Sequence, residues 1–168
     1  MDLGILQETY IGETRIPLIP FAVGELVKQG NRAVIQSEAG LAAGFDDQAY
    51  REMGATIVYS AEEVISRAEL VLKVYPPSKE EYQNLEEGQI LFSFLQLSHA
   101  TKGNLELLLD RRITAIGFEA IEEPDGNRPI LTVMSEIAGK LCIPIAAHYM
   151  QVRQVGRGIL LEGMPGVP

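Results

Sequence analysis

The feature that most constrains this chain is the alternation of short, uninterrupted apolar runs with amphipathic segments. The intervening segments carry helix signals, such as Pro20 at a first helical position, Asp46 as an N-cap, and Ser60 with Glu63 as a capping box. Apolar strands separated by helices of about ten residues are typical of a parallel sheet covered on both faces. We therefore predict an α/β fold with a three-layer, parallel, flavodoxin- or Rossmann-like sheet. The six predicted strands are residues 3–8, 32–37, 55–60, 69–74, 89–95 and 113–119.

Charge and composition narrow the classes of partner. The chain has 168 residues, enough for one domain with a sizeable core, and a formal net charge of −9. This acidic balance argues against nucleic acid or an anionic membrane surface as a partner. No apolar stretch reaches the roughly 18–20 residues of a membrane span, and no secretory signal is evident at the N-terminus. With a single cysteine, Cys142, these features favour a cytoplasmic protein.

The first candidates for a site are the side chains that follow each predicted strand, because ligands of open α/β sheets bind beyond the carboxyl ends of the strands. Arg15 follows the first strand, Lys73 ends the fourth and Glu119 ends the sixth. A polar cluster follows the fifth strand and consists of Gln96, Ser98 and His99. The sequence therefore places two cations and several polar groups at one edge of one sheet.

Each candidate has an ordinary structural alternative. Lys73 interrupts the apolar run ELVLKV, where a buried ammonium is costly unless it is paired; alternatively, its side chain extends to solvent. Arg15 offers a planar fork of donors that suits a carboxylate, or it is a surface arginine beside Glu13. His99 is a candidate proton-transfer group, or a solvated loop or cap residue. Ser135 is a candidate cap at the start of the last helix, near amides that suit an anion, or only marks that start.

The chain carries no recognisable cofactor or metal motif. Residues 40–45 (GLAAGF) lack the glycine spacing of a dinucleotide-binding turn, and residues 156–163 (GRGILLEG) follow no predicted strand. One cysteine and two histidines are too few for an ordinary zinc site. We expect this chain to bind no cofactor and no metal by itself.

Six blocks in colinear order nevertheless resemble a known family. They read ETRIPLIP, LVLKVYPP, GQILFSFLQLSHA, AIGFEAIEEPDGNRPIL, MSEIAGKL and GRGILLEGMPGVP. Together they resemble the N-terminal domain of the family of alanine dehydrogenases and nicotinamide nucleotide transhydrogenase alpha subunits, and the last two blocks favour alanine dehydrogenase. The resemblance implies a substrate-side α/β domain (1–133), a long inter-domain helix (134–150) and a Gly/Pro-rich linker (151–168). The linker leads toward the family's NAD-binding domain, which this chain lacks.

The resemblance also implies an activity. Alanine dehydrogenases reversibly oxidise L-alanine with NAD to pyruvate, ammonia and NADH. By analogy with the family, Arg15 binds the substrate carboxylate, Lys73 contacts the substrate and polarises its carbonyl, and Met134 lines the pocket. NAD is bound by the following Rossmann domain. The expected ligand of this chain is a small 2-keto or 2-amino acid such as pyruvate or alanine.

Two departures from the family pattern bear on catalysis. The family's acid/base histidine, in the pattern LFxYLHL, aligns with Gln96, and a carboxamide does not exchange protons near neutral pH. His99 lies three residues later; if the strand continues, it points to the opposite face, about 10 Å along, unless the chain turns sharply after Leu97. The second departure is the missing cofactor domain, together with the C-terminal helices that complete the family's N-terminal domain. We therefore expect self-association, as a homo-oligomer, or a partner chain.

Three functions follow from these observations, and whether the chain alone is an enzyme is left open. It is the substrate-binding part of an alanine-dehydrogenase-like oxidoreductase, inactive alone. Alternatively, it is a free-standing, non-catalytic binding or regulatory module for a small amino or keto acid, which Gln96 favours. In the third hypothesis it is one chain of a two-chain, transhydrogenase-like enzyme.

Overall fold

The computed structural model describes residues 1–154 and 156–161, and the chain divides into two compact units, Met1–Ala120 and Ile121–Pro168. The first unit holds a six-stranded sheet in the order β3-β2-β1-β4-β5-β6, and every neighbouring pair is parallel. This order confirms the predicted Rossmann-like fold, and the winding reverses between β1 and β4. The strands are β1 (Asp2–Ile5), β2 (Arg32–Gln36), β3 (Thr56–Val58), β4 (Leu70–Leu72), β5 (Ile90–Ser93) and β6 (Thr114–Gly117).

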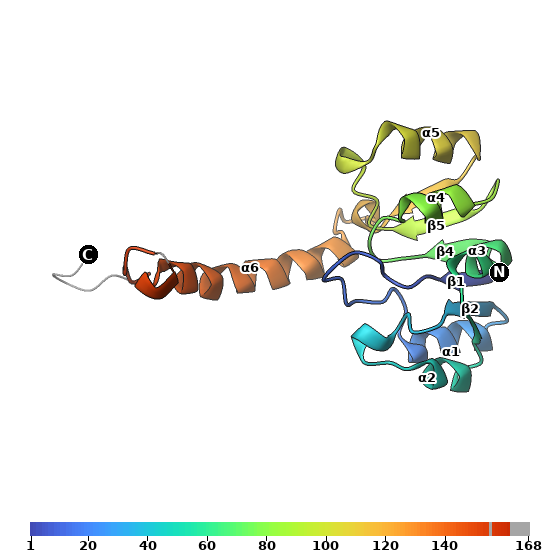
Figure 1. Cartoon of the computed structure of the whole chain (residues 1–168), viewed down its shortest axis with the longest axis horizontal. Coiled ribbons are helices and arrows are strands. Elements are labelled where there is room, and N and C mark those ends of the chain that lie inside the picture. The colour runs from blue at the N-terminus through green and yellow to red at the C-terminus, as the bar shows by residue number, and fades with distance from the viewer. Residues whose placement is uncertain (155, 162–168) are drawn as a thin grey trace. The chain divides into compact units, whose positions relative to one another are not determined.

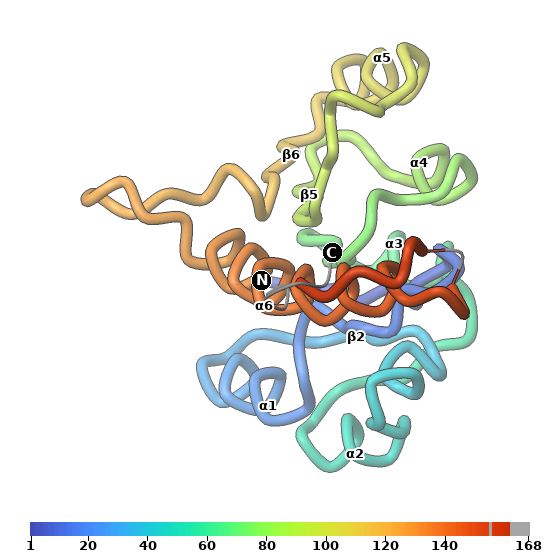
Figure 2. The backbone as a smooth tube through the Cα atoms, turned by 90° about the vertical axis from the view of Figure 1, so that its left-hand side faces the viewer, coloured from blue at the N-terminus to red at the C-terminus, as the bar shows by residue number. Residues whose placement is uncertain are grey.

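Helices cover both faces of the sheet, which confirms the three predicted layers (Figures 1 and 2). Their bounds are α1 (Pro20–Lys28), α2 (Asp47–Glu52), α3 (Ala61–Arg67), α4 (Lys79–Asn84) and α5 (Lys102–Asp110), with short 3₁₀ turns η1 (Leu41–Ala43), η2 (Leu97–His99) and η3 (Phe118–Ala120). One apolar cluster packs beneath α3, α4 and α5, and the other beneath α1 and α2. Alternate residues of β2 divide between them, Val34 in the first cluster and Ile35 in the second.

Local sequence explains how closely the layers pack. A Cβ atom on Gly4 of β1 would lie 2.6 Å from the Ala68 Cβ and 2.8 Å from the Val64 Cγ1. Helix α3 can therefore approach β1 only because this position has no side chain. At the start of α3, the Ser60 hydroxyl accepts a hydrogen bond from the Glu63 N–H, the first half of the predicted capping box.

The last helix is longer than predicted. Helix α6 runs from Pro129 to Met150, with a proline in its first turn, and is followed by the turn η4 (Val152–Gln154). Its N-cap is Arg128, so Ser135 lies inside the helix and its predicted role as a cap is wrong. The predicted linker 151–168 lies partly outside the described residues, because residues 155 and 162–168 are not described.

Helix α6 also corrects the expectation that no segment is apolar enough to cross a membrane. The helix has 22 residues, and an 18-residue window within it has a mean hydropathy of 1.6. Glu136, Lys140 and Pro144 interrupt the apolar run in the sequence, which is why the run looked too short. A single helix of this kind is weak evidence for a membrane span, because core helices of soluble proteins have the same length and composition.

Candidate functional site at the carboxyl edge of the sheet

The strand order places Lys73 and the segment that leads from β1 to Arg15 at the point where the winding reverses. The chain leaves β1 at Ile5 and β4 at Leu72, and these two strands are neighbours with Ile5 opposite Leu72. Residues that follow them lie on either side of the switch point, the usual ligand crevice of such sheets. The segments after β1 and β4 are therefore the centre of the candidate site.

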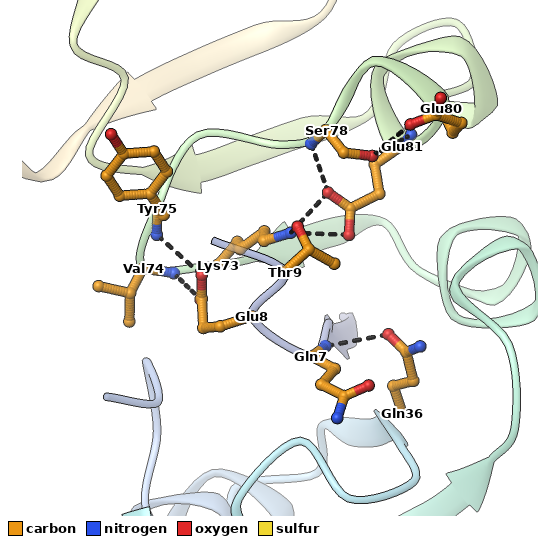
Figure 3. Close-up of polar contacts among 10 residues, drawn as sticks. All are labelled: Gln7, Glu8, Thr9, Gln36, Lys73, Val74, Tyr75, Ser78, Glu80 and Glu81. Carbon is orange, nitrogen blue, oxygen red and sulfur yellow. Dashed lines mark hydrogen bonds and ion pairs between the residues drawn. The ribbon is translucent and has the colours of Figure 1, made fainter. Parts of the chain in front are cut away.

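Lys73, the first residue after β4, is fully buried, so the alternative of a side chain that extends to solvent is wrong. Its Nζ donates hydrogen bonds to Glu81 Oε1 at 2.7 Å, to Glu81 Oε2 at 2.6 Å and to Thr9 Oγ1 at 3.1 Å. Figure 3 shows these acceptors meeting at Nζ from two different segments of the chain. Each of the three N–H groups of the ammonium thus has an acceptor.

Glu81 was not predicted as a site residue. It is the third residue of α4, where its Oε2 accepts the Ser78 N–H at 2.6 Å and its own N–H donates to Ser78 Oγ at 3.2 Å. This is a complete capping box, and the pattern S-x-x-E at 78–81 was a visible signal for it. A capping glutamate is ordinarily at the surface, whereas Glu81 is 4% exposed. One carboxylate therefore both begins a helix and neutralises a buried ammonium.

Glu8, in the segment that follows β1, binds the backbone that follows Lys73. Its Oε1 accepts the Val74 N–H at 2.6 Å and its Oε2 accepts the Tyr75 N–H at 3.2 Å (Figure 3). Burial raises the pKa of the Glu8 carboxyl above its ordinary value, and the two backbone hydrogen bonds oppose this effect. Glu8 thus holds the backbone that follows Lys73, and Thr9 binds the Lys73 side chain. Both residues reach across the switch point.

Arg15 forms an ion pair with Glu13, the neighbour named in its predicted structural alternative. Its Nε donates to Glu13 Oε1 at 2.8 Å and its Nη2 donates to Glu13 Oε2 at 2.5 Å. The pair lowers the pKa of the Glu13 carboxyl and raises the pKa of the Arg15 guanidinium through these side-chain hydrogen bonds. The guanidinium carbon also lies 5.7 Å from the centre of the Phe94 ring, within the range of a cation–π contact.

A cavity of about 250 Å³ opens beside Arg15 at this edge of the sheet. Its lining residues are Gln7, Glu8, Glu13, Arg15, Glu38, Ala39, Leu41 and Ala42. Gln7 is fixed at the cavity by its N–H, which donates to Gln36 Oε1 at 2.9 Å (Figure 3). A guanidinium and several carboxylates in one cavity complement a small molecule that carries both a carboxylate and an amino group.

The chain turns sharply after β5, so the strand does not continue to His99 and the condition for His99 to point to the opposite face of the sheet is not met. Strand β5 ends at Ser93, and Gln96 has a φ of 45°, in the left-handed region. Glu119 holds this turn, because its carboxylate accepts the Leu95 N–H at 3.2 Å and the Gln96 N–H at 2.9 Å. The 3₁₀ turn η2 follows directly and ends at His99.

Gln96 and His99 consequently line one cavity of about 170 Å³, together with Tyr75 and Asn104. His99 is exposed, and its Nδ1 lies 3.1 Å from the Ser98 Oγ. Their roles in catalysis stay predictions, as do those of Arg15 and Lys73.

Met134 lies on α6, in the second unit, and its predicted place in a substrate pocket stays a prediction. Residues 1–154 and 156–161 contain no group of three or more histidine, cysteine, aspartate or glutamate side chains that could hold a metal ion.

The model of the alanine dehydrogenase/PNT N-terminal domain matches residues 4–138. The chain belongs to this family. It is 40% identical over 167 residues to the alanine dehydrogenase of Mycobacterium tuberculosis, 39% over 168 residues to that of Staphylococcus haemolyticus and 38% over 167 residues to that of Methanococcus maripaludis. These alignments cover 99–100% of this chain but 44–45% of each relative. The chain thus spans a little less than half the length of the curated relatives it matches.

Solved structures agree with this assignment. An L-alanine dehydrogenase matches with a TM-score of 0.86 and 41% identity, over 99% of this chain and 46% of that chain. A transhydrogenase from Sinorhizobium meliloti matches with a TM-score of 0.64 and 23% identity, over 71% of this chain and 35% of that one, which shows a shared fold. The resemblance carried by the six sequence blocks is therefore confirmed.

Proposed function

We propose that this chain is the substrate-binding part of an alanine-dehydrogenase-like oxidoreductase, which converts L-alanine, NAD and water to pyruvate, ammonia and NADH, and that the chain is inactive alone. Its family and its likeness to alanine dehydrogenases support this proposal. The observation that carries it is the fully buried ammonium of Lys73 at the switch point of the sheet. A buried charge at a strand end is costly to maintain, and the crevice at a switch point is where sheets of this kind bind ligands.

The proposed roles follow from the chemistry of the side chains. Arg15 binds the substrate carboxylate through its planar donor fork, beside the cavity that it lines. Lys73 donates a hydrogen bond to the carbonyl oxygen of pyruvate, which draws electrons from the carbonyl carbon and makes it a better acceptor for ammonia. Loss of water then leaves the imine of the substrate, and the carbon of that imine takes up the hydride. Gln96 orients a carbonyl or a water molecule without taking its proton. Met134 contributes an apolar wall.

The turn after β1 does not fit a dinucleotide. Where a dinucleotide-binding turn has glycines that let a pyrophosphate approach the backbone, this chain has the Glu8 carboxylate bonded to the Val74 and Tyr75 N–H groups. We therefore assign NAD, which supplies or accepts the hydride, to a domain that follows residues 151–168. In this proposal residues 1–133 form the substrate-side domain and residues 134–150 the connecting helix.

The exposed apolar surface of α6 supports the proposal that a partner chain, or more of the same chain, covers this helix. Its described residues are exposed or half-buried, and apolar side chains such as Val133, Ile137 and Leu141 lie open to solvent. Exposed apolar surface of this kind favours association. We propose that a second copy, a partner chain or the remainder of a longer protein covers it, and that the protein is cytoplasmic.

A second candidate is a non-catalytic binding module for a small amino or keto acid. Gln96 favours it, because a carboxamide cannot serve as the acid/base group. The two candidate functions share the same binding site. They differ in turnover: only the enzyme part is expected to turn over substrate when the chain is joined to, or mixed with, an NAD-binding partner.

Pyruvate binding to the isotope-labelled 168-residue chain, followed by NMR, tests the shared site. We expect wild type to bind pyruvate and Lys73→Met to lose this binding. The matched control is Lys79→Met, which removes the same charge from an exposed position of α4. Arg15→Ala is a second variant, expected to bind at least tenfold more weakly, because one charge-assisted contact is worth about 1.5–3 kcal/mol. Equal affinity of wild type and folded Lys73→Met would remove Lys73 from the site.

A further inference from the structure

The buried ammonium of Lys73 has no donor left for a ligand. Its three N–H groups are taken by two oxygens of Glu81 and by the Thr9 hydroxyl, and its side chain has no exposed surface. A substrate oxygen can therefore reach Lys73 only if one of these acceptors gives way.

The acceptors are unequal. The Glu81 carboxylate is charged, lies 2.6–2.7 Å from Nζ and is held in place by the Ser78 N–H. Its removal would leave a buried charge without a counter-charge. The Thr9 hydroxyl is neutral and lies farther from Nζ, at 3.1 Å, on an exposed residue outside any strand or helix. Both acceptors bind a charged donor, but only the Glu81 carboxylate adds the attraction between opposite charges. Thr9 is the acceptor that can leave.

We propose that the Thr9 hydroxyl occupies the position on Lys73 that the substrate's carbonyl oxygen takes, so that binding exchanges one for the other while Glu81 stays in place. This inference rests on the proposed function. It makes Thr9 a determinant of affinity, because each bound substrate must replace a hydrogen bond that the protein already makes.

The neighbours of Thr9 indicate how it moves. Glu8 is anchored to the Val74 and Tyr75 N–H groups, and the Tyr10 ring stacks on the Tyr75 ring with 3.9 Å between centroids. The side chains of the residues on both sides of Thr9 thus contact the segment that follows Lys73. Rotation of the Thr9 side chain, rather than movement of the whole segment, is the motion these anchors leave open.

Thr9→Val tests the exchange, because valine keeps the shape of threonine and removes the acceptor. We expect this variant of the 168-residue chain to bind pyruvate at least about tenfold more tightly than wild type, the value of one hydrogen bond from a charged donor. Thr9→Ser, which keeps the hydroxyl, is the matched control and should bind like wild type. Acetate, which has a carboxylate but no ketone, should bind equally to wild type and Thr9→Val.

The outcomes separate this inference from the proposed function. If wild type binds pyruvate, Lys73→Met does not, and Thr9→Val binds no more tightly than wild type, only the role of Thr9 is wrong. If wild type does not bind, or Lys73→Met binds equally, the proposed site fails and the exchange fails with it. A second readout uses the Thr9 methyl group: its NMR signal should shift on saturation of wild type with pyruvate, and an unchanged signal overturns the exchange.

Discussion

Glu81→Gln is the substitution that most sharply tests the buried ion pair. The Lys73 ammonium and the Glu81 carboxylate are 2.6 Å apart, and their side chains are 0% and 5% exposed. Removal of one partner from such a pair costs about 3–5 kcal/mol, because the other charge stays buried without a counter-charge. Glutamine keeps an oxygen that can accept the Ser78 N–H, so little of this cost comes from the helix cap.

A double-mutant cycle isolates the interaction between the two charges. We expect Lys73→Met and Glu81→Gln each to lower the free energy of unfolding by about 3 kcal/mol, and the double variant to lose about 2 kcal/mol less than their sum. Ser78→Ala, which removes the capping hydroxyl and neither charge, should cost about 1 kcal/mol. Urea titrations at neutral pH give these values. If the cost of the double variant equals the sum of the two single costs to within about 0.5 kcal/mol, the coupling is refuted.

Three further predictions concern charge, packing and turnover. Arg15 holds the pKa of the Glu13 carboxyl below its ordinary value, so the pair stabilises the fold above that ordinary pKa and this contribution is lost as the pH falls through the lowered pKa. Urea titrations near pH 6 and pH 3 should therefore show that acid lowers the free energy of unfolding less in Glu13→Gln than in wild type. Equal losses of this free energy would count against a contribution from the pair. Gly4→Ala should destabilise by about 1–3 kcal/mol, because the new Cβ would lie 2.6 Å from the Ala68 Cβ. Gly103→Ala, in α5 with open space around it, should stabilise by about 0.5–1 kcal/mol in the same assay, and the opposite order would be inconsistent with this packing. The 168-residue chain alone should show no NADH-dependent amination of pyruvate in an absorbance assay; measurable turnover would show that it carries a cofactor site.

The fold was predictable because its signals are local. Apolar runs, caps and helix stops determine six strands and the helices between them, and these signals lie within a few residues of each element. The predicted start of the last helix, at Met134, is five residues later than the start of α6. Proline at the first helical position was the signal that marks the true start.

The site was predictable only in outline. The rule that ligands bind beyond the strand ends selected Arg15, Lys73 and Gln96 correctly as residues of that edge. The burial of Lys73 depends on Thr9, which lies 64 residues away in the chain, and on Glu81. The capping role of Glu81 is local, whereas its contact with the ammonium is tertiary. No local pattern encodes such contacts.

The turn at Gln96 has the same origin. Its left-handed backbone is supported by Glu119, which lies 23 residues farther along the chain and follows the neighbouring strand β6. The sequence predicted a strand that ends at residue 95 and left open whether it continues. The tertiary hydrogen bonds turn the chain here and bring His99 to the cavity that Gln96 lines. His99 is therefore closer to Gln96 than the strand alternation suggested.

The most direct test of the site is a crystal structure of the chain soaked with pyruvate. We expect the keto oxygen within hydrogen-bond distance of Lys73 Nζ, the carboxylate on the Arg15 guanidinium, Glu81 still paired with Lys73, and the Thr9 hydroxyl turned away. Pyruvate bound elsewhere, with the hydrogen bond from Lys73 to Thr9 intact, would contradict it.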